Sequence, residues 1–351
     1  MRHHPPCGRA RAALMAAAVA LAAGCSGSDV TPQEPAPAQA ERRGAPRLRV
    51  ILDTDANNEL DDQHAIAYLL FNADTWHIEG ITTNRTRNGG GIDQHTAEAE
   101  RVVRLCASEQ AVQVRSGASG TFEAIKDHVH EAGYDGHEAV DFIVDRARRH
   151  TPDDKLVLIP VGKLTNIALA LHKNPAIAPN VRVLWLGSNW PTDATEYNEA
   201  DDHAAINHLM NSPVEFDIAL VRYGVTGPEA GTAAVEVSTA EIREKMAGLG
   251  PRVAPVAGRS GGEFTTFGDY SVNLFETSKS ERRALYDLAA VALVKNPAWA
   301  QAQQVPAPHI VGGQWQARPD NPRTVRFYKN FDGPAIIADF YRAMAAPALQ
   351  R

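Results

Sequence analysis

Four aspartates lie within ten residues of one another. Asp53 and Asp55 follow the apolar run 47–52, and Asp61 and Asp62 begin a segment whose apolar residues recur at helical spacing. Like charges this close raise each other's pKa and destabilise the ionised forms. A helix N-terminus and a bound divalent cation would both offset this repulsion, and carboxylate oxygens favour calcium or magnesium. Helix capping alone could explain Asp61 or Asp62, but the full spacing favours a cation site.

The rest of the chain alternates apolar runs with helical patterns. The expected strands are 47–52, 77–83, 155–160, 181–186 and 216–221, and the expected helices are 61–71, 97–106, 138–148, 164–172, 202–210 and 282–294. Residues 258–275, rich in glycine and aromatic residues, are expected to form a loop. The alternation predicts an α/β fold, with a mostly parallel central sheet flanked by helices.

Polar segments follow each of the expected strands. They are Asp53 and Asp55, Asn84 and Asn88, Gly162 to Thr165, Gly187 to Asn189, and Tyr223 with Gly224. Right-handed crossovers place such loops at one edge of the sheet, where α/β proteins bind ligands. We therefore expect these residues to face one crevice.

Four segments, in order, resemble one known family. Ile-Leu-Asp-Thr-Asp at 51–55, followed by Asp61-Asp62, resembles the N-terminal signature of the inosine-uridine nucleoside hydrolases. That signature is typically Asp-x-Asp-Pro-Gly-x-Asp-Asp, so the loop here is two residues longer and lacks Pro-Gly. The other matching segments are 161–168, Glu196-Tyr197-Asn198 with Asp201-Asp202 after it, and 286–289. The resemblance runs from about residue 48 to at least 295 and implies a Rossmann-like nucleoside hydrolase fold.

The resemblance implies calcium-dependent hydrolysis of the N-glycosidic bond of a ribonucleoside or a related N-riboside, giving free base and ribose. Asp55 would be the catalytic base and would also bind Ca2+. The other metal ligands would be Asp62, the main-chain oxygen of Thr165, and Asp287. The ribose hydroxyls would be bound by Asp61, Asn88 (Asn84 being the other candidate), Glu196 and Asn198. Carboxylates near the sugar would stabilise its oxocarbenium-like transition state.

Tyr286 is the main departure from the family, which often has a histidine there to protonate the leaving base. A tyrosine, with an ordinary pKa of about 10, is a weaker acid near neutrality. His203, His208 or stacking by Trp190 could assist the leaving group instead, although each of these residues also has an ordinary packing explanation.

Two other functions fit parts of the pattern. Asp-x-Asp after a strand also resembles the haloacid-dehalogenase-type phosphatases, which use magnesium. In that family, however, a Thr or Val occupies the position of Asn57, and the later segments would go unexplained. The second alternative is a lipid-anchored, calcium-dependent protein that binds a nucleoside or sugar without turnover, because fold resemblance does not establish catalysis.

The N-terminus has the features of a bacterial lipoprotein. Arg2, Arg9 and Arg11 precede the apolar segment 12–23, and Leu-Ala-Ala-Gly-Cys ends at Cys25. This predicts a lipoprotein signal peptide over 1–24 and lipidation of Cys25. Residues 25–46 are expected to form a disordered tether, and 47–351 one domain. The protein would be exported and held by its lipid on the periplasmic side of a membrane, with Ser26 favouring the outer membrane.

The charge and the cysteine content limit the kinds of binding partner and disulfide that can be expected. The formal charge of the 351-residue chain is −7, and removal of the three arginines in residues 1–24 leaves −10. This acidic balance argues against nucleic-acid binding. Apart from Cys25, the only cysteine after the signal is Cys106, so we expect no intrachain disulfide. The expected partner is a small-molecule nucleoside or N-riboside, and the resemblance leaves a homo-oligomer open.

Overall fold

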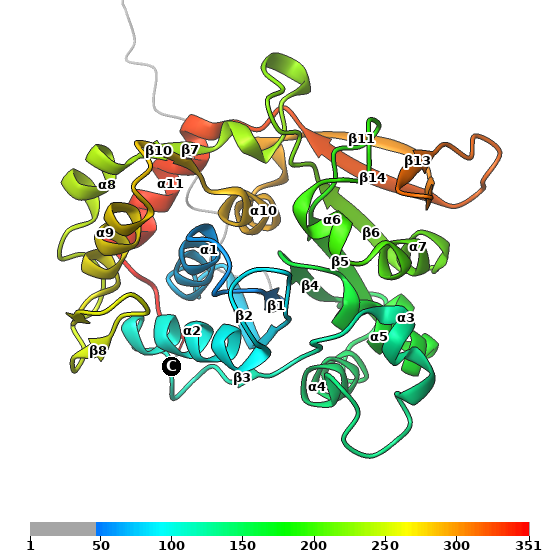
Figure 1. Cartoon of the computed structure of the whole chain (residues 1–351), viewed down its shortest axis with the longest axis horizontal. Helices are drawn as coiled ribbons and strands as arrows, with labels where there is room; N and C mark the ends of the chain where they lie inside the picture. The colour runs from blue at the N-terminus through cyan, green and yellow to red at the C-terminus, as the bar shows by residue number, and fades with distance from the viewer. Residues whose placement is uncertain (1–46, 351) are drawn as a thin grey trace, which may run out of the picture. The chain divides into compact units, whose positions relative to one another are not determined.

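The computed structural model describes residues 47–350 of the chain (Figure 1). The predicted signal peptide, Cys25 and the tether lie outside the described residues, and their assignments therefore stay predictions. Within residues 47–350, no helix is both long enough and apolar enough to cross a bilayer.

A single eight-stranded sheet organises the fold, in the order β11-β14-β6-β5-β4-β1-β2-β3. Its strands are β1 (Leu48–Thr54), β2 (Trp76–Thr83), β3 (Val114–Arg115), β4 (Leu156–Pro160), β5 (Val181–Leu186), β6 (Glu215–Ala219), β11 (Gln301–Pro306) and β14 (Thr324–Lys329). All neighbouring strands are parallel except β11 and β14. This confirms the mostly parallel sheet, whose central strand β1 ends next to the aspartates.

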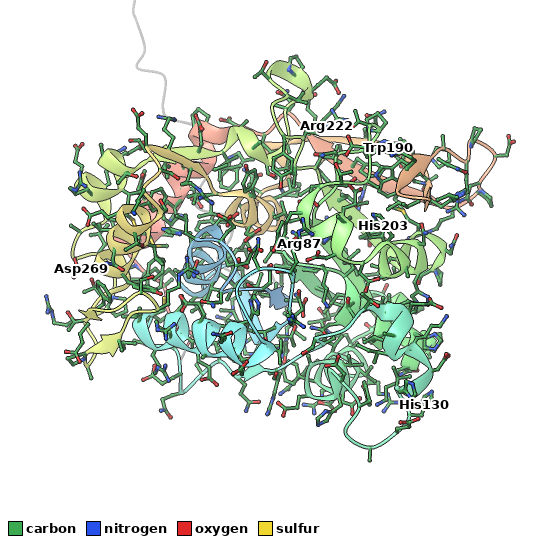
Figure 2. The ribbon with its side chains drawn as sticks, in the orientation of Figure 1. Arg87, His130, Trp190, His203, Arg222 and Asp269 are labelled. Carbon is green, nitrogen blue, oxygen red and sulfur yellow. The ribbon has the colours of Figure 1, made fainter. Side chains whose placement is uncertain are left out.

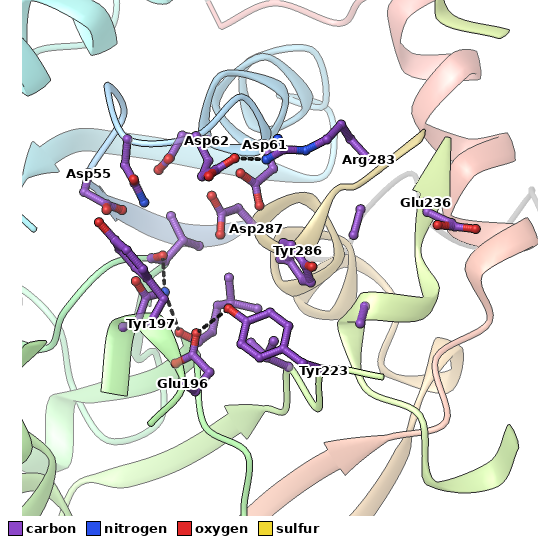
Figure 3. A pocket seen from close by; sticks show the side chains of 18 of the residues that line it. Asp55, Asp61, Asp62, Glu196, Tyr197, Tyr223, Glu236, Arg283, Tyr286 and Asp287 are labelled. Carbon is purple, nitrogen blue, oxygen red and sulfur yellow. Dashed lines mark hydrogen bonds and ion pairs between the residues drawn. The ribbon is translucent and has the colours of Figure 1, made fainter. Parts of the chain in front are cut away.

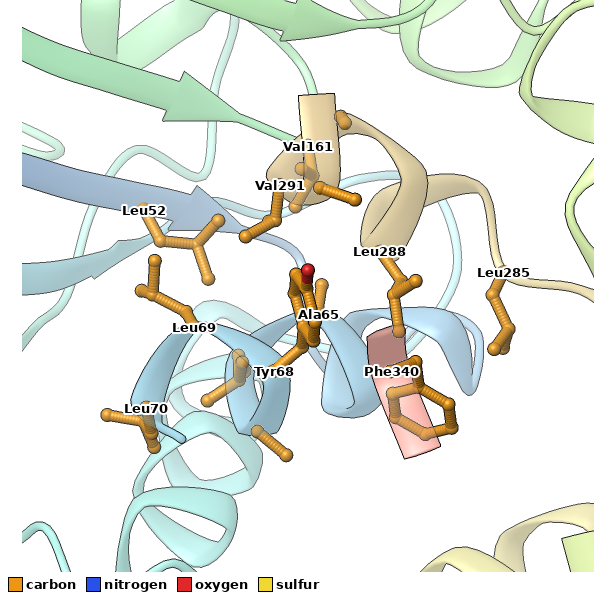
Figure 4. Packing of buried hydrophobic residues seen from close by; sticks show 14 of the residues in the cluster. Leu52, Ala65, Tyr68, Leu69, Leu70, Val161, Leu285, Leu288, Val291 and Phe340 are labelled. Atoms are coloured by element: carbon orange, nitrogen blue, oxygen red, sulfur yellow. The ribbon is translucent and has the colours of Figure 1, made fainter. Parts of the chain in front are cut away.

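The main helices cover both faces of the sheet. They are α1 (Asp61–Leu70), α2 (Ile92–Leu105), α4 (His137–Ala147), α5 (Thr165–Lys173), α7 (His203–Asn211), α9 (Phe267–Ser278), α10 (Tyr286–Lys295) and α11 (Gly333–Ala345). Alternate residues of β1 point to opposite faces. Val50 and Leu52 pack with α1, α2, α10 and α11, whereas Ile51 packs with α4, α5 and α7. Figure 4 shows Leu52 of β1, Leu69 of α1 and Val291 of α10 in one cluster.

Shorter elements complete the domain. They are the helices α3 (Phe122–Ile125), α6 (Tyr197–Asp201) and α8 (Thr239–Met246), and the strands β7 (Glu236–Ser238), β8 (Val256–Ala257), β9 (Glu263–Phe264), β10 (Arg282–Ala284), β12 (His309–Val311) and β13 (Gln314–Gln316). Strand β7 pairs with β10, β8 with β9, and β12 with β13.

Two local predictions were wrong. The loop expected over 258–275 ends at Thr266, whose side chain caps helix α9 by accepting a hydrogen bond from the Asp269 main-chain N–H. Phe267, Tyr270 and Leu274 recur at helical spacing and are buried, so tertiary packing supports this helix. The helix expected over 282–294 begins only at residue 286, because residues 282–284 form strand β10 against β7.

Candidate active site

A cleft of about 520 Å³ opens at the carboxyl ends of the central strands (Figure 3). Its lining comes from the loop after β1, the first turns of α1 and α10, the ends of β4, β5 and β6, helix α6, and the β7–β10 pair. The lining residues are Asp55, Asn58, Glu59, Asp61, Asp62, Val161, Leu186, Glu196, Tyr197, Asn198, Val221, Tyr223, Gly224, Ala233, Glu236, Arg282, Arg283, Ala284, Tyr286 and Asp287. A crevice therefore exists at this edge of the sheet, but of the polar residues expected to face it only Asp55, Tyr223 and Gly224 line it.

An acidic cluster forms one wall of the cleft. Carboxylate oxygens of Asp61, Asp62 and Asp287 lie within 4.8 Å of one another, and all three residues are buried. These aspartates occupy the first turns of α1 and α10, where the helix dipoles favour negative charge. Thr54 Oγ1 donates a 2.5 Å hydrogen bond to Asp62 Oδ1, and Asp55 lines the same cleft. Two helices and one strand thus bring together acids that are far apart in the sequence.

Burial and mutual repulsion make the ionised cluster costly without a counter-charge. Burial raises the pKa of Asp55 and of Asp61 from 3.8 to about 7. Burial and neighbouring carboxylates raise the pKa of Asp62 and Asp287 well above the ordinary value. A hard divalent cation among these oxygens would lower all four pKa values. The cluster of Asp61, Asp62 and Asp287 can therefore hold a metal ion.

Asp53 supports the site from beneath instead of facing the cleft. Its carboxylate accepts hydrogen bonds from Thr82 Oγ1 at 2.6 Å, Asn84 Nδ2 at 2.7 Å and Asn166 Nδ2 at 2.7 Å. Burial raises its pKa to about 6, although these three hydrogen bonds oppose the rise. Asp53 thereby ties β1 to β2 and to helix α5.

Thr165 is not placed to bind the cation. It is the first residue of α5, and its Oγ1 donates a 2.5 Å hydrogen bond to Asp202 Oδ2. Helical carbonyls point toward the C-terminus of their helix, so the Thr165 oxygen points away from the strand ends. Val161, directly after β4, lines the cleft instead, and its carbonyl accepts a 2.8 Å hydrogen bond from Asn198 Nδ2. The structure therefore does not bring the expected main-chain ligand, Thr165, to the cleft, and Val161 lies there four residues earlier.

Neither asparagine proposed after β2 lines the cleft. Asn88 is exposed, and its main-chain N–H donates to Tyr197 Oη at 3.0 Å. Asn84 is buried and donates to Asp53. Asn58, in the longer loop after β1, lines the cleft instead. The structure thus does not place Asn88 at the expected sugar site.

The predicted sugar-binding residues Asp61, Glu196 and Asn198 do line the cleft together. Glu196 is buried, and its Oε2 accepts hydrogen bonds from the main-chain N–H groups of Ser188 at 3.1 Å and Glu199 at 3.0 Å. Burial raises the pKa of Glu196, and these N–H groups counteract the rise. The side chain is held rigidly across the cleft from the acidic cluster (Figure 3).

Tyr286 also lines the cleft, where its ring meets that of Tyr223 edge to face at 5.8 Å. Burial, reinforced by the Asp61 carboxylate, raises the pKa of Tyr286 above 10. The phenol is therefore an even weaker acid than an ordinary tyrosine.

None of the three alternatives for assisting the leaving group is among the residues that line the cleft. Figure 2 labels two of them, Trp190 and His203. His203 Nε2 lies 2.9 Å from the Ala194 carbonyl oxygen, and His208 packs on Phe122. Trp190 stacks on Phe327 with ring centroids 5.5 Å apart. These contacts account for all three side chains as packing residues.

The sequence analysis missed the residues that hold the longer loop after β1. His95 Nδ1 lies 2.8 Å from the Asp55 carbonyl oxygen, Gln63 Nε2 donates to the Ala56 carbonyl at 2.8 Å, and Arg259 donates to the main chain of the loop. A weak signal existed in Gln63 and His95, polar residues at buried positions of helices. Arg259, some two hundred residues away along the chain, gave no such signal.

Comparison with known proteins identifies a family that this chain matches. Residues 50–337 match the family described as "Inosine-uridine preferring nucleoside hydrolase". A non-specific ribonucleoside hydrolase, RihC, of Salmonella paratyphi A is 31% identical over 186 residues. That match covers 48% of this chain and 59% of the relative, so it spans less than two thirds of that relative's length.

Solved structures share the fold. A plant nucleoside hydrolase, the PpNRh1 enzyme, superposes with a TM-score of 0.66 at 17% identity, covering 86% of this chain and 100% of that one. A purine-preferring ribonucleoside hydrolase from Gardnerella vaginalis gives 0.61 at 21% identity, covering 85% and 98%. With the match over residues 50–337, the chain belongs to the inosine-uridine preferring nucleoside hydrolase family.

Proposed function

We propose that the protein hydrolyses the N-glycosidic bond of ribonucleosides, or of a related N-riboside, with Ca2+ held at the acidic cluster. The observation that carries this proposal is the convergence of four buried aspartates, from three parts of the sequence, on one cleft opposite Glu196. These carboxylates together can bind a cation and a sugar diol and can stabilise a developing positive charge.

The oxygen atoms at the cluster fit calcium well. Asp55, Asp62 and Asp287 offer carboxylates, and the Val161 carbonyl offers a main-chain oxygen in place of Thr165. Calcium takes six to eight oxygen ligands in a flexible geometry, and waters and sugar hydroxyls can fill the remaining positions. A bound cation would lower the pKa of the attacking water and orient the ribose diol.

The chain's own residues supply the remaining steps. Asp55, which lines the cleft beside the acidic cluster, accepts the proton of the attacking water. Asp61, Glu196 and Asn198 bind the ribose hydroxyls. The carboxylates around the sugar stabilise its oxocarbenium-like transition state electrostatically.

Product analysis tests this function on the full-length chain. We expect release of free base and ribose from at least one member of a ribonucleoside panel, loss of release with a calcium chelator, and loss in Asp55→Asn. The exposed acid Asp145, paired with Arg149 on the surface, gives a matched control variant, Asp145→Asn. If no ribonucleoside yields base at any calcium concentration, the hydrolase proposal fails. Saturable binding measured by calorimetry would then support the binding-protein alternative.

Export and membrane anchoring through Cys25 belong to the same proposal and rest on the sequence. In cells, wild-type protein should fractionate with membranes and Cys25→Ser should not. A homo-oligomer is proposed by resemblance alone, and sedimentation of the purified protein tests it.

A further inference from the structure

The two departures from the family signature meet in space. Glu59 lies in the longer loop after β1, and Arg283 lies in β10, three residues before Tyr286. Their side chains form an ion pair, and both residues line the cleft. The loop is fixed beneath this pair, because Arg259 donates to the Glu59 carbonyl at 3.4 Å. Figure 3 shows Arg283 reaching over the Asp61 side of the cleft, next to Tyr286.

Arg283 is the more shielded of the two cations that line the cleft. No histidine or lysine of residues 47–350 is among the lining residues. The two cations, Arg282 and Arg283, occupy the β7–β10 end, which is formed by Glu236, Arg282, Arg283 and Ala284. The Arg282 side chain is 51% exposed and pairs with Glu236, whereas that of Arg283 is 25% exposed. Shielding from water strengthens the electrostatic effect of Arg283 on a bound group.

The position of the sugar fixes where the leaving group lies. If Asp61, Glu196 and Asn198 hold the ribose, the base has room on the side of the cleft where Figure 3 shows Tyr223, Tyr286, Arg283 and Glu236, away from Asp55 and Tyr197. A base attached to that ribose would thus project toward Arg283 and the two phenols.

Bond cleavage places negative charge in this space. The water oxygen bonds to C1′ and gives its proton to Asp55, while the C1′–N electron pair leaves on the base. That charge spreads from the ring nitrogen to the carbonyl oxygens of the base, and the departing anion takes a proton from solvent. An arginine cannot supply that proton near neutrality, but its five N–H groups can hydrogen-bond the anion as it forms.

We propose that Arg283, held in place by Glu59, is a catalytic residue that stabilises the leaving base by hydrogen bonding and charge. This role rests on the proposed hydrolase function and replaces proton donation by a histidine. Glu59 is a positioning residue, since it acts through Arg283. Bases whose carbonyl oxygens carry the developing charge, such as hypoxanthine and uracil, should leave more readily than adenine.

The test compares two substrates in the full-length protein with calcium. Inosine needs help at its leaving group, whereas 4-nitrophenyl β-ribofuranoside releases a phenolate that is stable unaided. Loss of one pre-organised donor typically costs ~10²-fold in rate, so Arg283→Gln should lower kcat for inosine by about that factor and leave the nitrophenyl substrate nearly unchanged. Glu59→Gln should shift the same ratio in the same direction by less. Arg243→Gln, which removes an exposed ion pair between α8 and α9, is the control and should resemble wild type.

Each other outcome has a defined meaning. If wild type cleaves neither substrate, the hydrolase function itself fails. If wild type cleaves both and Arg283→Gln lowers both equally, or neither, the leaving-group role of Arg283 is overturned. Melting temperatures of the variants show whether an equal loss comes from misfolding, and Arg283→Lys then repeats the comparison with the charge retained. An inosine-specific loss in Tyr286→Phe but not in Arg283→Gln would assign the role to the phenol.

Discussion

The acidic cluster should make the stability of the protein depend on calcium and pH together. In the cation-free protein, burial raises the pKa of Asp55 and Asp61 from 3.8 to about 7. Between these values the folded chain binds more protons than the unfolded chain. The contribution of these groups to the free energy of unfolding therefore falls as the pH rises from about 4 to about 7. A bound cation offsets the cost of ionising these buried carboxylates.

The size of the calcium effect follows from linkage. A ligand that binds only the folded state, present at a hundred times its Kd, stabilises by ~2.7 kcal/mol. For a domain of this size, that corresponds to a rise in Tm of roughly 4 °C. Near pH 5 the rise should be smaller, because protons compete with calcium for the same carboxylates.

Thermal unfolding with chelator or with calcium, at about pH 5 and about pH 8, measures this coupling. Other acids also titrate, so the informative comparison is with Asp62→Asn/Asp287→Asn, which removes two carboxylates of the cluster. This variant should lose the calcium-dependent rise, and the surface control Asp145→Asn should keep it. A calcium effect that is equal at both pH values, or that persists in the double variant, would refute the assignment of the cation to this cluster.

Four substitutions distinguish residues that support the site from residues that contact the substrate. Asn166→Ala removes a buried hydrogen bond to Asp53 and should lower the free energy of unfolding by about 2 to 4 kcal/mol in a denaturant titration; an unchanged midpoint would contradict that role. Asn84→Ala should likewise lower Tm, whereas Asn88→Ala should leave Tm and kcat/KM near wild type, since its side chain is exposed. Glu196→Gln should lower kcat/KM for a ribonucleoside by ~10- to 100-fold, the range for losing a hydrogen bond to a charged group. Unchanged kinetics would remove Glu196 from the sugar site.

Much of the sheet was predictable because buried parallel strands form continuous apolar runs. The strands β1, β4 and β5 contain such runs, and the ends of the predicted strands located the crevice. Strand β11 gave no such signal, since Gln301–Gln304 are exposed and their extended form depends on pairing with β14. Helix α9 was hidden in a Gly- and aromatic-rich segment, where packing decided the structure.

The carboxylates of the site could be predicted from sequence motifs. The main-chain oxygen that faces the cleft was harder to predict, because its position depends on the direction of the main chain. Asp55, Asp61, Asp62 and Asp287 converge as expected. The main-chain oxygen facing the cleft depends on where β4 ends, and that point favours Val161 over Thr165. Of the residues that hold the longer loop, Gln63 and His95 gave only a weak signal, and Arg259, in a distant segment, gave none.

Calcium titration of the chelated protein, with base release and calcium binding followed in the same samples, tests the central claim most directly. Our account predicts that hydrolysis of a ribonucleoside is absent in chelator, rises in parallel with the binding of one Ca2+ per chain, and is lost in Asp55→Asn. Full activity in chelator, or no base release once the site is saturated, would contradict it.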